Sequence, residues 1–357
     1  MRPNTRHKNP LGDISVLYVS VMARAIRAEG EDPTELLGRF GLDEQALRAP
    51  EARISIPRFM RMGQAAIALT GNPAFGLTMG KLSRPVDAGL AGLAAQCAPT
   101  AGEAIRTLVH YALLTSRNSR GVPWTAHRGR EAHFYSIRPY NVFNFFVVDS
   151  VLAAWTQFLR VITGRSEVLE GVAIEYPSQG QEELFEQWFG CSVVFGADSN
   201  RLRLAPGIAD TVSLQAQPAM FEKLARECQQ ELLRIRAGWT TGDRVKDLLP
   251  PLFQGDTPTL AIIAEKLGMA PWTLQRQLKE ENTGFQELVD ETRKELAVEY
   301  IRETRTSLSE IAWLLGFANP SAFHKAWRRW FQASPGEYRK HHETEQAARN
   351  INQGAQT

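Results

Sequence analysis

Apolar positions in the first third of the chain recur at the three- and four-residue spacing of amphipathic helices. From Ile14 to about Asn118 four segments show this period, with Gly or Pro between them. They read ISVLYVSVMARAIRAEG, PTELLGRFG, SIPRFMRMGQAAIALTG and GLAGLAAQCAPTAGEAIRTLVHYALL. This region is therefore predicted to be helical throughout.

The pattern changes near Val122. The stretch VPWTAHRGREAHFYSIRP alternates and has turn residues from Arg128 to Glu131, which predicts a hairpin. A long apolar segment, NVFNFFVVDSVLAAWTQFLRVITG, then predicts a mostly buried helix. VAIEY, QEELFEQWFG, CSVVFG and NRLRLA predict a strand, a helix and two strands. Because long helices precede a compact block of strands, residues 1–215 are predicted to be an α+β domain rather than a doubly wound sheet.

The second part of the chain is predicted to be helical. The amphipathic segment AMFEKLARECQQELLRIRA and the stretch GWTTG at 238–242 are expected to form a helix and linker over residues 216–242. No strand pattern follows, so an all-α domain is predicted over residues 243–341. The polar residues 342–357 are expected to be a disordered tail.

This all-α region contains an internal repeat at an offset of 48 residues. Each copy has a glycine four residues after an alanine and then a second helix, which is the organisation of a helix-turn-helix unit. The small alanine lets two helices approach, and the glycine allows a turn that a Cβ would obstruct. The matching pairs are Ile263 and Ile311, Ala264 and Ala312, Leu267 and Leu315, and Gly268 and Gly316.

Capping residues support the division into two units. Thr257 before Pro258 predicts a helix start, and Asn319 before Pro320 predicts another. Ser307 with a glutamate three residues later has the capping-box pattern. Between the units, FQELVDETRKELAVEYIRET predicts a linking helix of about 30 Å at a rise of about 1.5 Å per residue.

The later helix of each unit has an apolar and a polar face. Leu274 and Leu278 share one face of the first, so Trp272 points away from the core among polar residues. In the second, Phe323 and Trp327 take the inner face. Because successive major grooves recur about every 34 Å along DNA, the two helices are predicted to probe adjacent grooves.

The polar faces carry groups suited to DNA. An amide suits the edge of adenine and a guanidinium that of guanine, whereas basic side chains further along each helix are better placed for phosphates. Acidic residues slightly outnumber basic ones in this region, so its positive charge is expected to be one-sided. In the first helix, Gln275 and Arg276 are the side chains suited to base edges, and in the second helix Ser321, His324, Lys325 and Arg328 point outward. The side chains expected to contact phosphates are Thr273, Lys279, Arg328 and Arg329.

Composition narrows the class of protein. A chain of 357 residues with 43% hydrophobic and 22% charged residues is typical of a soluble globular protein, expected in the cytoplasm without a targeting or membrane segment. Three widely spaced cysteines argue against a disulfide framework and a zinc site, so no metal or cofactor is expected. No GxSxG, HExxH or phosphate-loop pattern is present, so enzyme activity is expected to be absent and stays a remote alternative for the first domain.

The segment from about 241 to 341 resembles the DNA-binding domain of AraC/XylS transcription regulators. The resemblance rests on IAEKLGMAPWTLQRQLKEENTGFQELV, SLSEIAWLLGF, SAFHKAW and RWFQASPGEYRK. It implies seven helices whose two helix-turn-helix units contact consecutive major grooves of promoter DNA. Ala270 departs from the family pattern, which has a serine cap there. The positions that the resemblance implies for base reading are Trp272, Gln275, Arg276, Pro320, Ser321, His324 and Lys325.

The upstream part resembles, less tightly, the arabinose-binding-like N-terminal domain of the subgroup that includes ornithine-utilisation regulators. The motifs APTAGEAIRTLVHYALL, QEELFEQW and FGCSVVFGADSNRLRLAP carry this resemblance. It implies an effector-sensing and oligomerisation domain, a homodimer, and an activator that works with RNA polymerase. A ligand-independent repressor or architectural DNA-binding protein is the alternative.

The effector itself is not identified by the resemblance. A pocket needs an apolar lining with a few converging polar groups, and arginines mixed with aromatics would suit an amino acid or another small carboxylate. Each candidate alone is more typical of a core aromatic or a surface cation. The candidates are His110, Tyr111, Arg117, Trp124, Tyr135, Arg138, Tyr140, Asn144 and Trp155.

Overall fold

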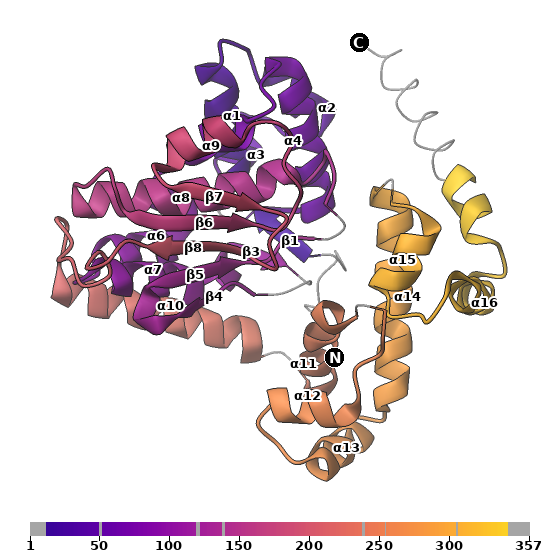
Figure 1. Cartoon of the computed structure of the whole chain (residues 1–357). Helices are drawn as coiled ribbons and strands as arrows, with labels where there is room; N and C mark the ends of the chain where they lie inside the picture. Colours follow the sequence, from indigo (N-terminus) through magenta and orange to yellow (C-terminus); the bar gives the residue numbers. More distant parts are fainter. Residues whose placement is uncertain are drawn as a thin grey trace. The chain divides into compact units, whose positions relative to one another are not determined.

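The computed structural model describes residues 12–49, 52–118, 122–137, 140–237, 240–253, 255–304 and 306–341. The chain divides into two compact units (Figure 1). The N-terminal unit comprises residues 12–237, and the described C-terminal unit begins at Thr240 and ends at His341.

The N-terminal unit begins with a small antiparallel sheet. Strand β1 (Gly12–Ser15) lies between β2 (Arg53–Ser55) and β3 (Ser116–Asn118). The prediction that this region is helical throughout is therefore wrong at three places. Ser15 and Ser55 end strands and cap the helices that follow, so each helical pattern begins directly after a short strand.

Helices make up most of this unit. The 13 residues of α1 (Val16–Ala28) and the 15 of α4 (Ile56–Thr70) each bury one face. Helix α5 (Phe75–Lys81) lies against α8 (Phe145–Thr163), where a Cβ built on Gly80 would lie 2.2 Å from the Ala153 Cβ. The remaining helices are α2 (Thr34–Arg39), α3 (Glu44–Leu47), η1 (Pro85–Ala88), α6 (Gly89–Gln96), α7 (Ala101–His110), η2 (Ala112–Leu114), η3 (His127–Gly129) and α9 (Glu182–Phe189).

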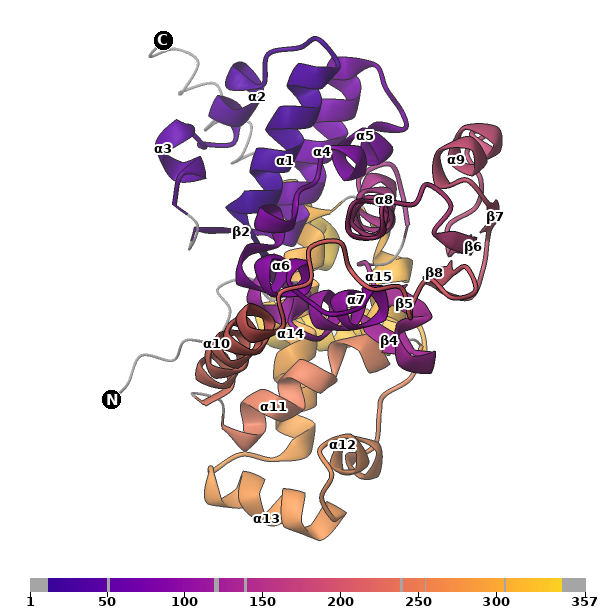
Figure 2. The same ribbon diagram turned by 90° about the vertical axis from the view of Figure 1, so that its left-hand side faces the viewer.

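A five-stranded sheet in the order β4-β5-β8-β6-β7 forms the second layer of the unit. The predicted hairpin is confirmed, because β4 pairs with β5 in antiparallel fashion. Helix α9 connects β6 to the parallel strand β7. The view in Figure 2 shows α7 and α8 on the same face of this sheet. The strands are β4 (Trp124–Ala126), β5 (Glu131–Phe134), β6 (Leu169–Ile174), β7 (Ser192–Phe195) and β8 (Asn200–Leu204).

Helix α8 is the core helix of the N-terminal unit. Its Leu152 and Leu159 are fully buried in a cluster with Val172 and Leu202 of the sheet. Among the helices described, α8 also has the length and apolar composition of a membrane span, and 56% of that stretch is buried inside the protein. The buried share and the packing on the sheet are those of a core helix.

Helix α10 (Pro218–Ala237) packs on the N-terminal unit. Its Cys228 and Leu232 are buried with Ala91 and Ala94 of α6. The Tyr111 hydroxyl donates a hydrogen bond of 3.2 Å to the carbonyl of Ala225. The helix predicted at the start of the connecting region is therefore part of this compact unit.

The C-terminal unit is all-α, as predicted. Seven α-helices fall within its described residues, the last covering residues 335–341. The tail predicted at 342–357 lies outside the described residues. The other helices are α11 (Thr241–Leu248), α12 (Leu260–Lys266), α13 (Pro271–Glu280), α14 (Phe285–Glu303), α15 (Leu308–Leu314) and α16 (Pro320–Phe331), with the short 3-10 turn η4 (Pro250–Leu252) after α11.

Two predicted boundaries in this unit are wrong. The proposed linker at 238–242 already contains the start of α11, because Thr240 caps the helix; residues 238 and 239 lie outside the described part. The cap of α12 is Thr259 rather than Thr257, and its hydroxyl accepts from Ile262 N at 3.4 Å. The Thr257 hydroxyl instead donates to the carbonyl of Gly316 at 3.4 Å.

Candidate nucleic-acid interface and ligand cavity

The two halves of the C-terminal unit turn in the same way. The amide of Met269 donates to the carbonyl of Ala264 at 3.0 Å, and 48 residues later that of Phe317 donates to Ala312 at 2.9 Å. Gly268 and Gly316 both have a φ of +67°, in the left-handed region that favours glycine. The repeat in the sequence is therefore a repeat of helix-turn-helix geometry.

Helix α13 presents a polar face that is open to solvent. Leu274 and Leu278 are buried, whereas Trp272 is 66% exposed and Gln275 and Arg276 are also exposed. The Arg276 guanidinium lies 5.6 Å from the centre of the Trp272 ring, a cation–π distance. An exposed indole, an amide and a guanidinium therefore stand together at one end of this helix.

The start of α13 lacks a side-chain cap. Ala270 occupies the N-cap position in an extended conformation and accepts no side-chain hydrogen bond there. Pro271 begins the helix, where a missing N–H leaves no donor unsatisfied. The departure from the family pattern at Ala270 therefore leaves the start of α13 without a side-chain cap.

Helix α16 is anchored more firmly. Phe323 and Trp327 are fully buried on its inner face. The side chain of Asn319 caps the helix by accepting from Ala322 N at 2.9 Å. Its outer face carries the exposed residues Pro320, Ser321, Lys325, Arg328 and Arg329 and the half-buried His324.

One basic residue of α16 already has a partner. The guanidinium of Arg329 lies 2.5 Å from a carboxylate oxygen of Asp290 on the linking helix α14, and the same carboxylate accepts from the Trp330 indole at 3.2 Å. Arg328 has no ion pair to an acidic side chain within the described residues. The two neighbouring arginines therefore differ in their freedom to meet a phosphate.

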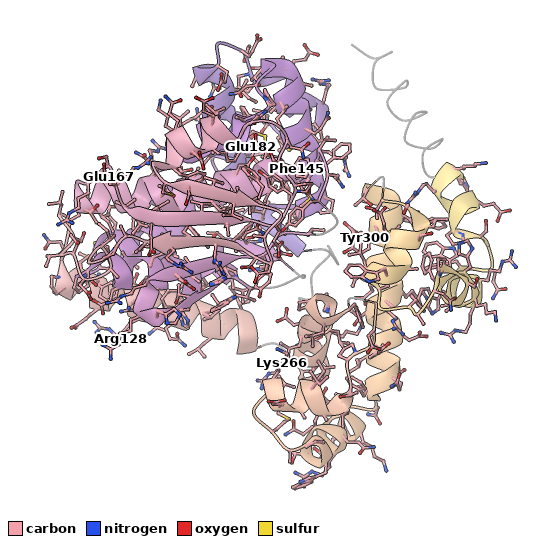
Figure 3. The ribbon with its side chains drawn as sticks, in the orientation of Figure 1. Arg128, Phe145, Glu167, Glu182, Lys266 and Tyr300 are labelled. Carbon is pink, nitrogen blue, oxygen red and sulfur yellow. The ribbon has the colours of Figure 1, made fainter. Side chains whose placement is uncertain are left out.

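The linking helix α14 packs within the C-terminal unit and contacts the second helix-turn-helix unit. At about 1.5 Å per residue its 19 residues span roughly 28 Å. Its buried face includes Leu296 and Tyr300, the latter labelled on α14 in Figure 3. Arg293 of α14 donates to the carbonyls of Leu315 at 2.8 Å and Gly316 at 2.6 Å, at the end of α15. Helix α14 is thus hydrogen-bonded directly to the turn of the second helix-turn-helix unit.

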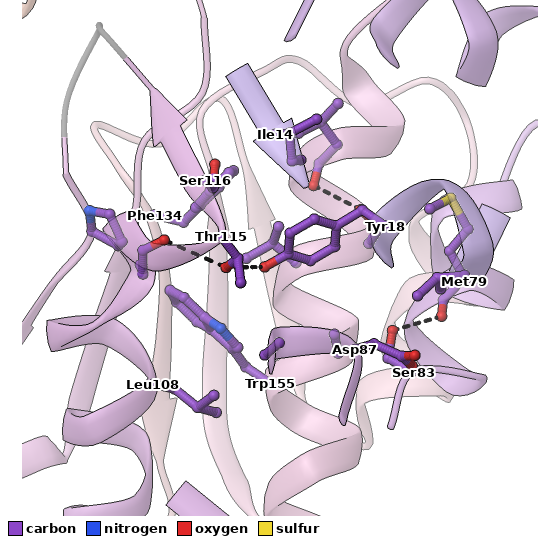
Figure 4. Close-up of a pocket in the computed structure, with 18 of the residues that line it drawn as sticks. Ile14, Tyr18, Met79, Ser83, Asp87, Leu108, Thr115, Ser116, Phe134 and Trp155 are labelled. Carbon is purple, nitrogen blue, oxygen red and sulfur yellow. Dashed lines mark hydrogen bonds between the residues drawn. The ribbon is translucent and has the colours of Figure 1, made fainter. Parts of the chain in front are cut away.

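The N-terminal unit contains a cavity of about 150 Å³. It lies among α1, α4, α5, α7, α8 and the strands β1, β3 and β5, and Figure 4 shows part of its lining. The Tyr18 and Thr115 hydroxyls meet at 3.0 Å inside it. Arg53 holds this region by donating to the carbonyl of Thr115 at 3.1 Å. Burial raises the pKa of Tyr18, so its hydroxyl stays protonated.

Comparison with known proteins identifies both units. Residues 30–211 match the family described as the arabinose-binding domain of AraC transcription regulators, N-terminal. Residues 263–341, which contain α13 and α16, match a helix-turn-helix domain. The chain belongs to the AraC family of transcription regulators. It is a sequence-specific DNA-binding regulator with an α+β N-terminal domain and a helix-turn-helix C-terminal domain.

Curated relatives align with nearly the whole length of this chain. The Ornithine utilization regulator of Pseudomonas aeruginosa is 26% identical over 92% of this chain and 96% of its own length. The HTH-type transcriptional regulator VirS of Mycobacterium tuberculosis is 28% identical over 88% of this chain and 92% of its own. A solved structure, the transcriptional regulator CdpR from Pseudomonas aeruginosa, is 22% identical with a TM-score of 0.41, covering 89% of this chain and 97% of that chain.

The eight predicted effector residues that the structure describes do not form one cluster in this regulator. Of the nine, Tyr135 and Trp155 line the cavity. Arg138 lies outside the described residues, and Arg117 on β3 is not part of the lining. Of the two arginines expected to hold a carboxylate, Arg117 alone belongs to the described residues, and it is not part of the described lining.

The other predicted effector residues have structural contacts. Trp124 stacks on His133 with ring centres 3.8 Å apart. His110 is exposed and lies edge-on to Tyr111, which packs under α10. The Tyr140 hydroxyl accepts from Asn200 at 2.7 Å, and Asn144 donates to the carbonyl of Ile137 at 2.7 Å.

Apart from Tyr135, sequence reasoning missed the polar residues that line the cavity. They include Tyr18, Asp87, Thr115 and Ser136, which come from four separate segments of the chain. Each lies in or beside a helical or alternating pattern, and nothing in that pattern marks the residue as part of a cavity. Only the tertiary fold brings them together.

Proposed function

We propose that this AraC-family regulator inserts α13 and α16 into consecutive major grooves of promoter DNA. The observation that carries the proposal is the matched exposure of two helix faces. Leu274 and Phe323 bury the inner faces, while Arg276 and Lys325 stand exposed on the outer ones. The 19-residue helix α14 between the two helix-turn-helix units spans about 28 Å, close to the roughly 34 Å repeat of the major groove.

Within this proposal the side chains divide by position along each helix. Trp272, Gln275 and Arg276 lie in the first two turns of α13, where an amide and a guanidinium can meet adenine and guanine edges and the indole can pack on a thymine methyl. Pro320, Ser321, His324 and Lys325 hold the corresponding part of α16. Thr273, Lys279, Arg328 and Arg329 remain the proposed phosphate contacts, which position the protein without reading sequence.

Replacing Arg276 with alanine tests the reading role of α13. Arg276→Ala is expected to cost about 1–3 kcal/mol of specific binding and to relax the preference at one base pair. Arg226→Ala is the matched control, because that arginine of α10 is 69% exposed and Arg276 is 62% exposed. Quantitative binding to promoter fragments with single base changes gives the measurement. Unchanged specificity in Arg276→Ala would show that α13 is oriented differently on DNA.

The N-terminal unit is proposed to sense a small-molecule effector and to form a homodimer. An effector changes the balance between arrangements of the protein only if it binds them with different affinity. We further propose activation through contact with RNA polymerase, in the cytoplasm, with no enzyme activity. The membership of residues 30–211 in the arabinose-binding family supports the sensing role.

Ligand-independent repression is the second candidate function. Reporter transcription and sedimentation of the full chain, each with and without candidate effectors, separate the two. An effector-dependent rise in transcription supports activation. Equal footprints and reporter output in every condition would favour a constitutive repressor or an architectural protein.

A further inference from the structure

We propose that the N-terminal cavity binds a neutral, mainly apolar molecule about the size of one ring, whose single polar group hydrogen-bonds to Ser136. This inference deepens the effector role proposed above and rests on it. It differs from the small-carboxylate hypothesis suggested by the sequence. Three properties of the lining carry it: an unpartnered hydroxyl, a buried carboxylate already paired with an arginine, and a small volume.

The first property is the state of the Ser136 hydroxyl. Ser136 is 5% exposed and lines the cavity, and its Oγ has no hydrogen-bond partner within the described protein. Buried hydroxyls normally find partners because leaving one unsatisfied is unfavourable. A ligand hydroxyl or carbonyl in the cavity would supply the missing partner.

Four other hydroxyls of the lining are already engaged. Tyr18 and Thr115 pair with each other at 3.0 Å. Ser83 donates to the carbonyl of Met79 at 3.0 Å, and Ser150 donates to that of Val147 at 3.0 Å (Figure 4 shows the Ser83 bond). Ser136 is therefore distinguished from them as a point at which a ligand gains a hydrogen bond without breaking one in the protein.

The second property is the charge of the lining. Asp87 is buried and lines the cavity. Its carboxylate forms an ion pair with Arg24 and accepts a hydrogen bond of 2.7 Å from the backbone N–H of Arg84. Arg84 also lines the cavity; its side chain lies 3.5 Å from Asp87 and is 60% exposed, so water screens much of its charge. A ligand carboxylate would face the Asp87 carboxylate, and a ligand amine would compete with Arg24. A neutral ligand avoids the repulsion from Asp87 and the competition with Arg24, and it has no charge of its own to bury.

The third property is size and apolarity. Aromatic and aliphatic side chains such as Phe59, Met60, Val151 and Trp155 make up most of the wall. A cavity of about 150 Å³ with such a lining has the capacity for a benzene-sized molecule. The volume suits a single ring or a short chain with one polar substituent and is small for a larger metabolite.

Three probes of one shape test the charge preference on the full-length protein. Benzyl alcohol, benzoate and benzylamine carry the same ring with a neutral, a negative and a positive group. Calorimetric titration is expected to show binding of benzyl alcohol at least about tenfold tighter than of either charged probe. Tighter binding of benzoate or benzylamine, or no binding of benzyl alcohol, would overturn the proposal.

Variants locate the binding. Ser136→Ala is expected to weaken benzyl alcohol severalfold while leaving toluene, which has no polar group, unaffected. Ser199→Ala changes a serine outside the lining and is the control. Ala154→Leu adds volume at a lining position and is expected to weaken both ligands, after thermal unfolding has confirmed the fold. If neither Ser136→Ala nor Ala154→Leu weakens benzyl alcohol, the site is elsewhere and the proposal fails.

Reporter transcription separates this proposal from the proposed function. If neutral probes bind through Ser136 but transcription does not respond to any cavity ligand, the ligand chemistry stands and the effector role fails. If transcription responds only to charged molecules that bind in the cavity, the effector role stands and the neutral-ligand proposal fails.

Discussion

The two helix-turn-helix units share a turn but differ in what surrounds it. Both turns contain a left-handed glycine with a φ of +67°. A Cβ on Gly268 would have nothing within 4 Å, whereas a Cβ on Gly316 would lie 2.1 Å from the carbonyl oxygen of Asp256. The first turn therefore needs glycine for its backbone angle alone, and the second needs it for the backbone angle and for space.

The support around the second unit extends beyond its turn. Asn319 caps α16 and Arg293 bonds the last carbonyls of α15, whereas Ala270 offers α13 no side-chain cap. Glu281, just after α13, accepts from Thr241 N at 2.7 Å and from Gly242 N at 2.8 Å, so the first unit instead caps α11. A sequence repeat thus preserves the side-chain pattern, while neighbouring elements decide how firmly each copy is held.

The largest expected difference is at the turn glycines. Gly316→Ala is expected to destabilise the C-terminal unit by roughly 3 kcal/mol or more, because positive φ and a clash with Asp256 add. Gly268→Ala is expected to cost about 1–2 kcal/mol, from the backbone angle alone. Urea unfolding monitored by tryptophan fluorescence measures both. Equal losses would remove the asymmetry between the two turns.

Arg293 is the next test of the second unit. Burial lowers the pKa of Arg293, and its guanidinium donates to Leu315, Gly316 and Thr257. Arg293→Met keeps the stem but leaves these oxygens without a charged donor, so the free energy of unfolding should fall by about 2–3 kcal/mol. Lys266→Met, at an exposed position on α12, is the control. A variant as stable as the parent would argue against this support.

The caps should respond in opposite directions. Ala270→Ser supplies the missing cap and is expected to stabilise α13 by about 0.5–1 kcal/mol, whereas Asn319→Ala should lose about 1 kcal/mol. The same unfolding assay measures both changes. Loss of stability in Ala270→Ser would mean that the start of α13 is held by something other than its cap residue.

The smallest expected difference concerns the two arginines of α16. Arg328→Ala should lower the salt dependence of DNA binding by about one phosphate contact, and it should weaken all sequences alike. Arg329→Ala should change the salt dependence less, because Asp290 already neutralises the Arg329 side chain. Binding titrations over a range of salt concentrations measure the slopes. A larger change in Arg329→Ala would show that DNA displaces Asp290.

Local patterns were sufficient to predict the helical nature of the C-terminal unit and the long N-terminal helices α8 and α10, but not every helix boundary. Burial of Leu274 and Phe323 and exposure of Trp272 follow directly from helical periodicity. Strands β1, β2 and β3 were missed because each has three or four residues and pairs with a distant segment. Thr259 was missed because Thr257-Pro258 offers the same local capping signal two residues earlier.

The cavity was not predictable from such patterns. Its lining joins residues as far apart as Ile14 and Val161, and its unpartnered hydroxyl at Ser136 is visible only after folding. The predicted carboxylate site combined residues that were close in the sequence or similar in type. The structure gives most of them separate structural contacts instead.

The most direct test of the two-groove proposal is a base-by-base specificity profile of the full-length protein and two variants. We predict two blocks of preferred bases with centres about 10–10.5 base pairs apart. Arg276→Ala should relax preference in one block only, and Lys325→Ala should relax it in the other only. A single block, or two variants that relax the same bases, would contradict the account.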